Sequence, residues 1–149
     1  MGPSSLVKRK KGMFIPKKSK FKKQQKGIKS NSINALNCAN QLTFGSIGLK
    51  AISFCRLNSK QIETIKKIIS KQIKKTGRLI IHAFPNVSIS QKSIENRMGK
   101  GKGNVDHWVF KIKPGFILCE IVTDQMEIAK KALASVIKRV SLKVKIVLN

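Results

Sequence analysis

The segment Asn58–Gly77, with the sequence NSKQIETIKKIISKQIKKTG, has the pattern of an amphipathic helix. Asn58 or Ser59 offers an N-cap, and Gly77 ends the run. The apolar residues recur at helical spacing, at Ile62, Ile65, Ile69 and Ile73. A cluster of lysines lies opposite this stripe, at Lys60, Lys67, Lys71, Lys74 and Lys75. One face is therefore predicted to pack on a core, and for this helix alone the other is best interpreted as a solvated lysine face.

A second amphipathic helix is predicted toward the end of the sequence. Asp124 and Glu127 have the spacing of a capping box. The apolar stripe that follows consists of Met126, Ala129, Leu133, Val136 and Val140.

Strands are predicted on both sides of these helices. The predicted ranges are 44–52, with irregularities at Gly45 and Gly48, then 79–84, 108–113, 116–122 and 142–148. Pro114-Gly115 is expected to turn the strand 108–113 into a hairpin with 116–122. The order of elements predicts an α+β fold, with two amphipathic helices packed on a mixed, mainly antiparallel sheet. We expect one domain over residues 43–149, preceded by an extended basic arm and polar loop over residues 1–42.

The charge of the chain is its most informative property. The 149 residues carry a net charge of +26, and residues 1–62 contain 14 basic and no acidic side chains. Such an excess repels itself unless anions surround it, so we expect a polyanionic partner. The first 30 residues include 11 lysines or arginines and are broken by Gly12, Pro16 and Gly27, which predicts an extended arm that packs no core.

Several other classes of protein are not supported. The sequence has no apolar run long enough to span a membrane and no signal-peptide pattern, and the arm is rich in lysine rather than arginine, unlike a transit peptide. Cys38, Cys55 and Cys119 lack metal spacing and are expected to be reduced and to pack as small apolar residues. His82 and His107 lie in no catalytic motif. We predict no enzyme activity, cofactor, metal or small-molecule substrate.

The segment Arg97–Asn104, RMGKGKGN, has three alternating glycines among basic residues. Glycines let a backbone approach a ligand closely, and the cations suit phosphate. The segment is neither a P-loop nor a dinucleotide-binding motif, because it leads into a strand rather than a helix. A flexible glycine hairpin with incidental lysines is the alternative if the motif is taken alone. With the net charge, it points to a nucleic-acid backbone, recognised through phosphates and shape rather than base stacking.

Several motifs together resemble the L-sixteen family of large-subunit ribosomal proteins (universal L-sixteen or L-ten-e type). The matching segments, in order, are 13–23, 44–51, Arg56-Leu57 leading into 61–63, Phe84-Pro85, 97–104, Trp108-Val109, Pro114-Gly115 and 118–120. The resemblance covers nearly all of residues 13–149 except 28–42. It implies an α/β hammerhead-like, non-catalytic protein bound to large-subunit ribosomal RNA beside the central protuberance and the aminoacyl-tRNA site. It also implies neighbouring ribosomal proteins and the aminoacyl-site tRNA as partners, and no membrane.

By the same resemblance, the basic arm from Lys17 to Lys29 and the loop from Pro85 to Gly103 are expected to reach toward the bound tRNA and the peptidyl-transferase RNA. The predicted RNA-binding residues are Lys17, Lys18, Lys20, Lys22, Lys23, Lys26, Lys29, Lys50, Arg56, Arg97, Gly99, Lys100, Gly101, Lys102 and Gly103. Each is expected to neutralise or position the RNA backbone without reading bases.

The sequence departs from the family pattern at a few positions. His82 stands where arginine is usual, Cys55 where glycine is usual, and Val87-Ser88 where Lys-Pro is usual. The many isoleucines and lysines suggest an A+T-rich genome, so a mitochondrial ribosome is the first choice and a plastid or the bacterial cytoplasm the alternative. Two other functions stay open, a DNA-compacting protein of an organelle nucleoid and, as the weakest, an enzyme acting on RNA.

Overall fold

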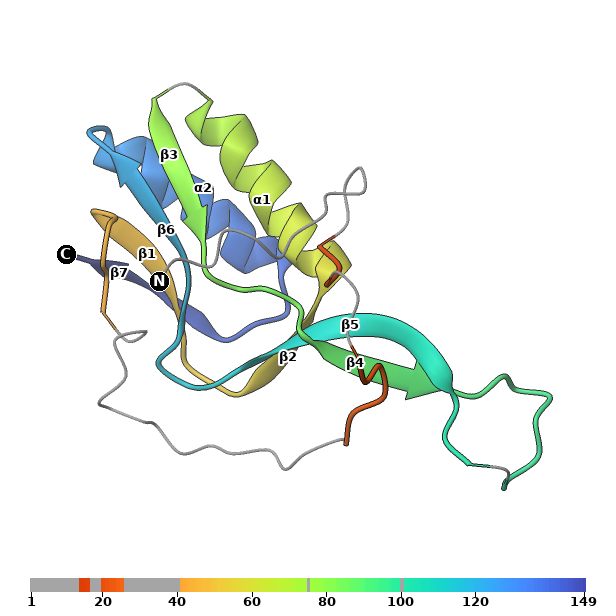
Figure 1. Ribbon diagram of the computed structural model, residues 1–149. Coiled ribbons are helices and arrows are strands. Elements are labelled where there is room, and N and C mark those ends of the chain that lie inside the picture. The colour runs from red at the N-terminus through yellow and green to blue at the C-terminus, as the bar shows by residue number, and fades with distance from the viewer. Residues whose placement is uncertain (1–13, 17–19, 26–40, 75, 100) are drawn as a thin grey trace.

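The computed structural model describes residues 14–16, 20–25, 41–74, 76–99 and 101–149, and these ranges contain two helices and seven strands. In chain order the elements are β1 (Ile47–Ala51), β2 (Cys55–Asn58), α1 (Ser59–Ile73), β3 (Gly77–Ile81), β4 (Val87–Gln91), β5 (Asn104–Ile112), β6 (Ile117–Thr123), α2 (Met126–Arg139) and β7 (Val144–Leu148). In Figure 1 both helices lie against the larger sheet, and the β4–β5 hairpin reaches away from them.

The strands form two sheets. The four-stranded sheet has the order β3-β6-β1-β7, and the three-stranded sheet has the order β2-β5-β4. Every strand pair in the described residues is antiparallel. The α+β class with two packed helices is therefore confirmed, while the strands divide between two antiparallel sheets instead of sharing one of mixed pairing.

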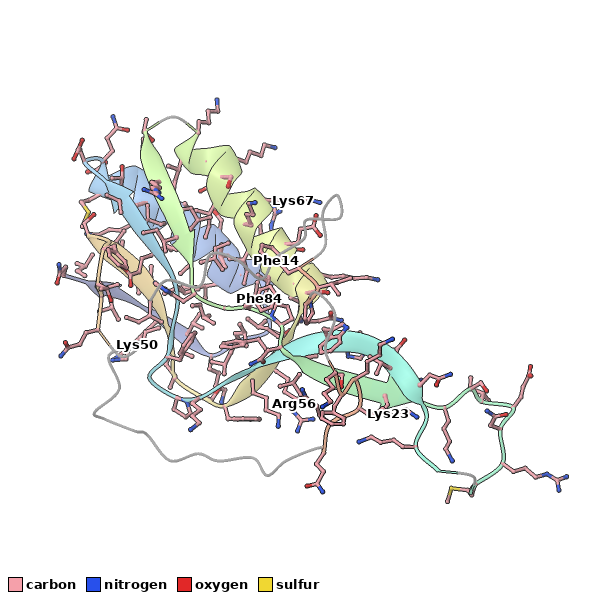
Figure 2. The ribbon with its side chains drawn as sticks, in the orientation of Figure 1. Phe14, Lys23, Lys50, Arg56, Lys67 and Phe84 are labelled. Atoms are coloured by element: carbon pink, nitrogen blue, oxygen red, sulfur yellow. The ribbon has the colours of Figure 1, made fainter. Side chains whose placement is uncertain are left out.

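Helix α1 confirms the predicted isoleucine stripe. Ile62, Ile65, Ile69 and Ile73 are all buried. Asn58 is the N-cap residue, and its backbone N–H donates to Oε1 of Gln61 over 2.9 Å. On the outer face, Lys67 pairs with Glu63 at 3.0 Å and stays largely exposed, as a solvated lysine face requires. Figure 2 shows Lys67 pointing away from the sheets.

Helix α2 has the predicted stripe but not the predicted cap. Ala129, Leu133 and Val136 are fully buried. The expected capping box at Asp124 is wrong, because Gln125 is the N-cap residue and has no side-chain cap hydrogen bond. The turn before the helix depends instead on Thr123, whose Oγ1 accepts the N–H of Gln125 over 3.2 Å.

The expected hairpin between 108–113 and 116–122 is also wrong. A turn is present, with the N–H of Phe116 donating to the carbonyl of Lys113 over 3.2 Å. However, the strand before it, β5, pairs with β2 and β4, whereas the strand after it, β6, pairs with β1 and β3. The N–H of Gly115 donates to the carbonyl of Ala51 over 2.8 Å, which directs the chain onto the four-stranded sheet.

Two short strands were not predicted from the sequence. β2 has only four residues and leads directly into α1. β4 has the sequence VSISQ, in which serines alternate with apolar residues that are only half-buried. Together with β5 these strands form the three-stranded sheet, from which the β4–β5 hairpin protrudes (Figure 1).

The core lies between the helices and the four-stranded sheet. Its fully buried side chains include Ile47, Leu49 and Ile121 from the sheet, and Ile69 and Leu133 from the helices. Burying one such side chain contributes about 1.5–3 kcal/mol. The helices and this sheet therefore form the stable base from which the hairpin extends.

Candidate nucleic-acid interface

The glycine- and lysine-rich segment lies in the hairpin loop, which we define as residues 92–103 between β4 and β5. Gly99 has φ of 113° and Gly101 has φ of 77°, backbone conformations that other residues rarely adopt. A Cβ added at either would meet no atom within 4 Å. These two glycines therefore shape the backbone in open surroundings, as close approach to a ligand would require.

Gly103 has a different role from the other two glycines. A Cβ added there would lie 2.5 Å from the carbonyl oxygen of Gln91, the last residue of β4. Gly103 therefore lets the two ends of the hairpin loop come together where β4 and β5 begin to pair.

Part of the predicted arm lies on this hairpin. We call residues 20–25 the arm segment. The hydroxyl of Ser88 in β4 donates to the backbone carbonyl of Lys22. Nε2 of Gln24 reaches the carbonyl of Asn86 at 3.5 Å. The arm segment thus runs beside β4, more than sixty residues away in the sequence.

Two lysines join the arm segment to the hairpin loop reciprocally. Nζ of Lys23 donates to the carbonyl of Lys102 over 2.7 Å, and Nζ of Lys102 donates to the carbonyl of Gln24. Within the loop, Nζ of Lys92 donates to the carbonyl of Gly99. The arm segment and hairpin loop together contain seven basic residues and a single carboxylate, that of Glu95. This is a concentrated positive surface of the kind that binds phosphates.

The other predicted residues lie in separate places. Arg56 in β2 is half-buried and pairs in register with Lys111 of β5. Lys50 in β1 is half-buried and lies opposite Lys145 of β7. In Figure 2, Lys23 and Arg56 are on the lower side of the molecule beside the smaller sheet, whereas Lys50 lies by the larger sheet. The structure therefore brings the arm segment and the hairpin loop together, but not Lys50.

The remaining predicted residues are either exposed or undescribed. Lys20, Lys22 and Arg97 are described; Lys20 and Arg97 are exposed, and Lys22 also contributes the carbonyl that Ser88 binds. Lys17, Lys18, Lys26, Lys29 and Lys100 lie outside the described residues. The extended basic arm as a whole and the boundary at residue 43 stay predictions.

One residue of the arm packs against the core, which the composition did not predict. Phe14 is half-buried and touches the hydrophobic core, and Nζ of Lys66 in α1 lies 5.9 Å from the centre of its ring. Figure 2 shows Phe14 beside α1. The expectation that nothing in the first 30 residues packs on a core is therefore wrong for this side chain.

Glu120 in β6 is a buried carboxylate whose role was not predicted. It is 1% exposed, and it accepts the backbone N–H groups of Phe44 at 2.8 Å and Gly45 at 2.7 Å. Thr43 N–H lies 3.2 Å away, and Nε2 of His82 lies 3.0 Å from Oε1. Burial raises the pKa of this carboxyl, but the hydrogen bonds from the backbone and from His82 outweigh burial and lower the pKa below its usual value of 4.5. Glu120 thus fixes the backbone of residues 43–45, just before β1.

The other candidate chemical groups are structural in this fold. Burial, with the charge of Glu120, raises the pKa of the Cys119 thiol to about 12, so this cysteine is an inert core residue. Nδ1 of His107 lies 2.7 Å from a carboxylate oxygen of its neighbour Asp106 at the surface.

No helix in the described part of the chain has the length and apolar content needed to cross a membrane.

Comparison with known proteins identifies the family. The family model for ribosomal protein L16p/L10e matches residues 16–147. The large ribosomal subunit protein uL16 of Buchnera aphidicola subsp. Cinara cedri (strain Cc) is 47% identical over 109 residues, which is 73% of this chain and 77% of that protein. The large ribosomal subunit protein uL16 of Sulfurovum sp. (strain NBC37-1) is 40% identical over 136 residues, which is 91% of this chain and 94% of that protein. The resemblance carried by the sequence motifs is confirmed, and the chain belongs to the ribosomal protein L16p/L10e family, as a structural protein of the large ribosomal subunit and not an enzyme.

Proposed function

We propose that this chain binds large-subunit ribosomal RNA near the central protuberance and the aminoacyl-tRNA site, where it supports tRNA positioning and subunit assembly. The observation that carries the proposal is the meeting of the arm segment with the hairpin loop on one protruding hairpin. Lysine ammonium groups on such a surface neutralise phosphates and fix the orientation of the protein on RNA. The neighbouring ribosomal proteins and the aminoacyl-site tRNA are the further partners.

The hairpin loop is the part proposed to come closest to the tRNA. It extends away from the helices (Figure 1), and within the loop Arg97 and Lys102 are exposed. Gly99 and Gly101 have no side chain to block the approach of a phosphate or ribose to the backbone, and a Cβ added at either would meet no atom within 4 Å. The exposed side chains of Ile94 and Met98 add apolar surface to the same loop.

Directed hydroxyl-radical probing tests this placement. An iron chelate attached at Met98→Cys, an exposed position of the hairpin loop, in the chain assembled into ribosomes is expected to cleave large-subunit RNA around the aminoacyl-tRNA site and to cleave tRNA bound there. The same chelate at Ala134→Cys, on the exposed surface of α2, is the control and should give a different set of cuts. A chain that sediments free of the large subunit at low salt would contradict the proposal. Preference for duplex DNA over ribosomal RNA at matched salt would favour a nucleoid protein instead.

The compartment belongs to the same proposal. The many isoleucines and lysines, which suggest an A+T-rich genome, favour a mitochondrial ribosome. The two bacterial relatives fit the alternative of the bacterial cytoplasm. Sedimentation of the tagged chain with mitochondrial or with cytoplasmic ribosomes distinguishes the two compartments.

A further inference from the structure

Ser88 is one of the few polar side chains that this fold buries. It lies in β4, at the edge of the three-stranded sheet, and is 7% exposed. Its hydroxyl donates to the carbonyl of Lys22, a residue 66 positions earlier in the chain. A buried hydroxyl that is satisfied by a carbonyl of the same chain forms a contact that water cannot easily replace.

We infer that Ser88 is a positioning residue for RNA binding, which holds the arm segment on β4 so that Lys22, Lys23 and Lys102 present one cationic surface to a single stretch of RNA. This inference rests on the proposed function. The chemical class of the ligand is the phosphate backbone of a folded RNA, and Ser88 itself acts only through the lysines.

The other contacts between the arm segment and the hairpin are more exposed. The bonds made by Lys23 and Lys102 are open to water, so solvent and salt screen them. The contact between Gln24 and Asn86 is 3.5 Å long and also exposed. Among these contacts of the arm segment, the bond from Ser88 is thus the one that is both uncharged and partly sheltered from water.

This arrangement should raise the affinity for RNA, because the lysines of the arm segment are already held in position on β4 in the absence of RNA. An arm that is free in solution loses conformational entropy when it binds, whereas an arm held on β4 has already lost it. The tether therefore raises affinity without adding a phosphate contact.

The experiment compares Ser88→Ala with Ser90→Ala in the full chain. Ser90 lies in the same strand and gives a control of identical chemistry. The affinity for deproteinised bacterial large-subunit ribosomal RNA is measured by filter binding between about 0.1 and 0.3 M salt, with duplex DNA as the competitor. Trypsin cleavage after Lys22 and Lys23 is followed by mass spectrometry without RNA, and thermal melting checks that each variant folds.

We expect Ser88→Ala to bind RNA about threefold to tenfold more weakly at every salt concentration, as the loss of one hydrogen bond predicts. The slope of log affinity against log salt should stay unchanged, because no cation is removed. Cleavage after Lys22 and Lys23 should become faster, while Ser90→Ala changes neither quantity and Ser88→Thr restores both. By contrast, Lys23→Gln should lower the slope by about one.

Two results would overturn the inference. One is a Ser88→Ala variant that trypsin cleaves no faster than the original chain. The other is unchanged RNA affinity in a variant whose arm is cleaved faster. Failure of the proposed function looks different, because the unmodified chain would then show no preference for ribosomal RNA over DNA, while the trypsin rates would still report on the tether.

Discussion

The two sheets of this molecule differ in what surrounds them. The four-stranded sheet lies under α1 and α2 and supplies Ile47, Leu49 and Ile121 to the core. The three-stranded sheet continues into a hairpin whose loop is exposed and basic (Figure 1). The first sheet lies wholly against the helices, whereas the second contributes Leu57 and Ile112 to the core and carries the proposed RNA-binding surface on its exposed hairpin. Substitutions in the core and in the hairpin loop should therefore have separable effects.

The largest expected loss of stability comes from the core that the helices form with the four-stranded sheet. Ile69→Asp places an unpaired carboxylate at a fully buried position of α1 and should destabilise the domain by about 4 kcal/mol or more, enough to unfold it. Urea denaturation followed by circular dichroism measures this. Ser70→Asp, at the adjacent exposed position, is the control and should change the unfolding free energy by less than about 1 kcal/mol. Equal losses for the two variants would contradict the assignment of the core face.

A smaller loss of stability is expected from a substitution at Glu120. Glu120→Gln keeps the shape but removes the charge that accepts the N–H groups of Phe44 and Gly45, and should reduce stability by about 3 kcal/mol at neutral pH. The pKa of Glu120 is lower in the folded chain than in the unfolded chain, so the carboxylate stabilises the fold fully above the unfolded pKa of about 4.5. This stabilisation is lost as the pH falls through the folded pKa. The difference in unfolding free energy between the original chain and the variant should therefore shrink below pH 4.5. A difference independent of pH would show that the carboxylate charge does not stabilise the fold.

Substitutions in the exposed hairpin loop should weaken RNA binding and leave the stability of the fold nearly unchanged. Lys100→Glu combined with Lys102→Glu should weaken binding to ribosomal RNA about tenfold or more and lower the salt slope by about two, while the unfolding free energy changes by less than about 0.5 kcal/mol. Lys130→Glu combined with Lys131→Glu, on exposed α2, makes the same change in net charge and is the control. If both pairs weakened RNA binding equally, bulk charge rather than the hairpin loop would explain the affinity. If the loop pair unfolded the protein, the loop would be structural.

The smallest effects distinguish two glycines in the same loop. Gly101→Ala meets no neighbouring atom but places alanine at φ of 77°, a strain of about 1 kcal/mol that the open loop can relieve by changing its backbone conformation. This change should weaken RNA binding severalfold and leave the melting temperature nearly unchanged. Gly103→Ala should lower the melting temperature, because its Cβ would meet the backbone of Gln91. Calorimetry and filter binding on both variants test the distinction. Identical behaviour would contradict the different roles given to the two positions.

The helices were predictable from the sequence because each carries its own periodic stripe, as the isoleucines of α1 show. Strand pairing was not predictable, because neither the alternation of β5 nor the nearly continuous buried run of β6 depends on whether the two strands pair with each other or enter different sheets. The start of α2 was misassigned because Asp124 is a typical N-cap residue, whereas in the structure the N-cap is Gln125, whose N–H donates to Thr123 in the preceding turn.

The candidate site was predictable only in part. The hairpin loop was found because its glycines and lysines are consecutive. Its contact with the arm segment joins residues 62 to 79 positions apart, and no local pattern encodes such a distance. Ser88 lies in no motif, and Glu120 lies in the matching segment 118–120, which by itself indicates no role for this carboxylate. The roles of both residues follow from burial, which only the folded chain reveals.

The 66 positions between Lys22 and Ser88 also set an order of events during synthesis. At about 5–20 residues per second, roughly 3–13 s pass between the translation of the carbonyl and that of the hydroxyl that binds it. During this interval the lysines of the arm segment have no strand to lie on, and any polyanion nearby can capture them. The arm segment of the nascent chain is therefore open to such capture until β4 has been made.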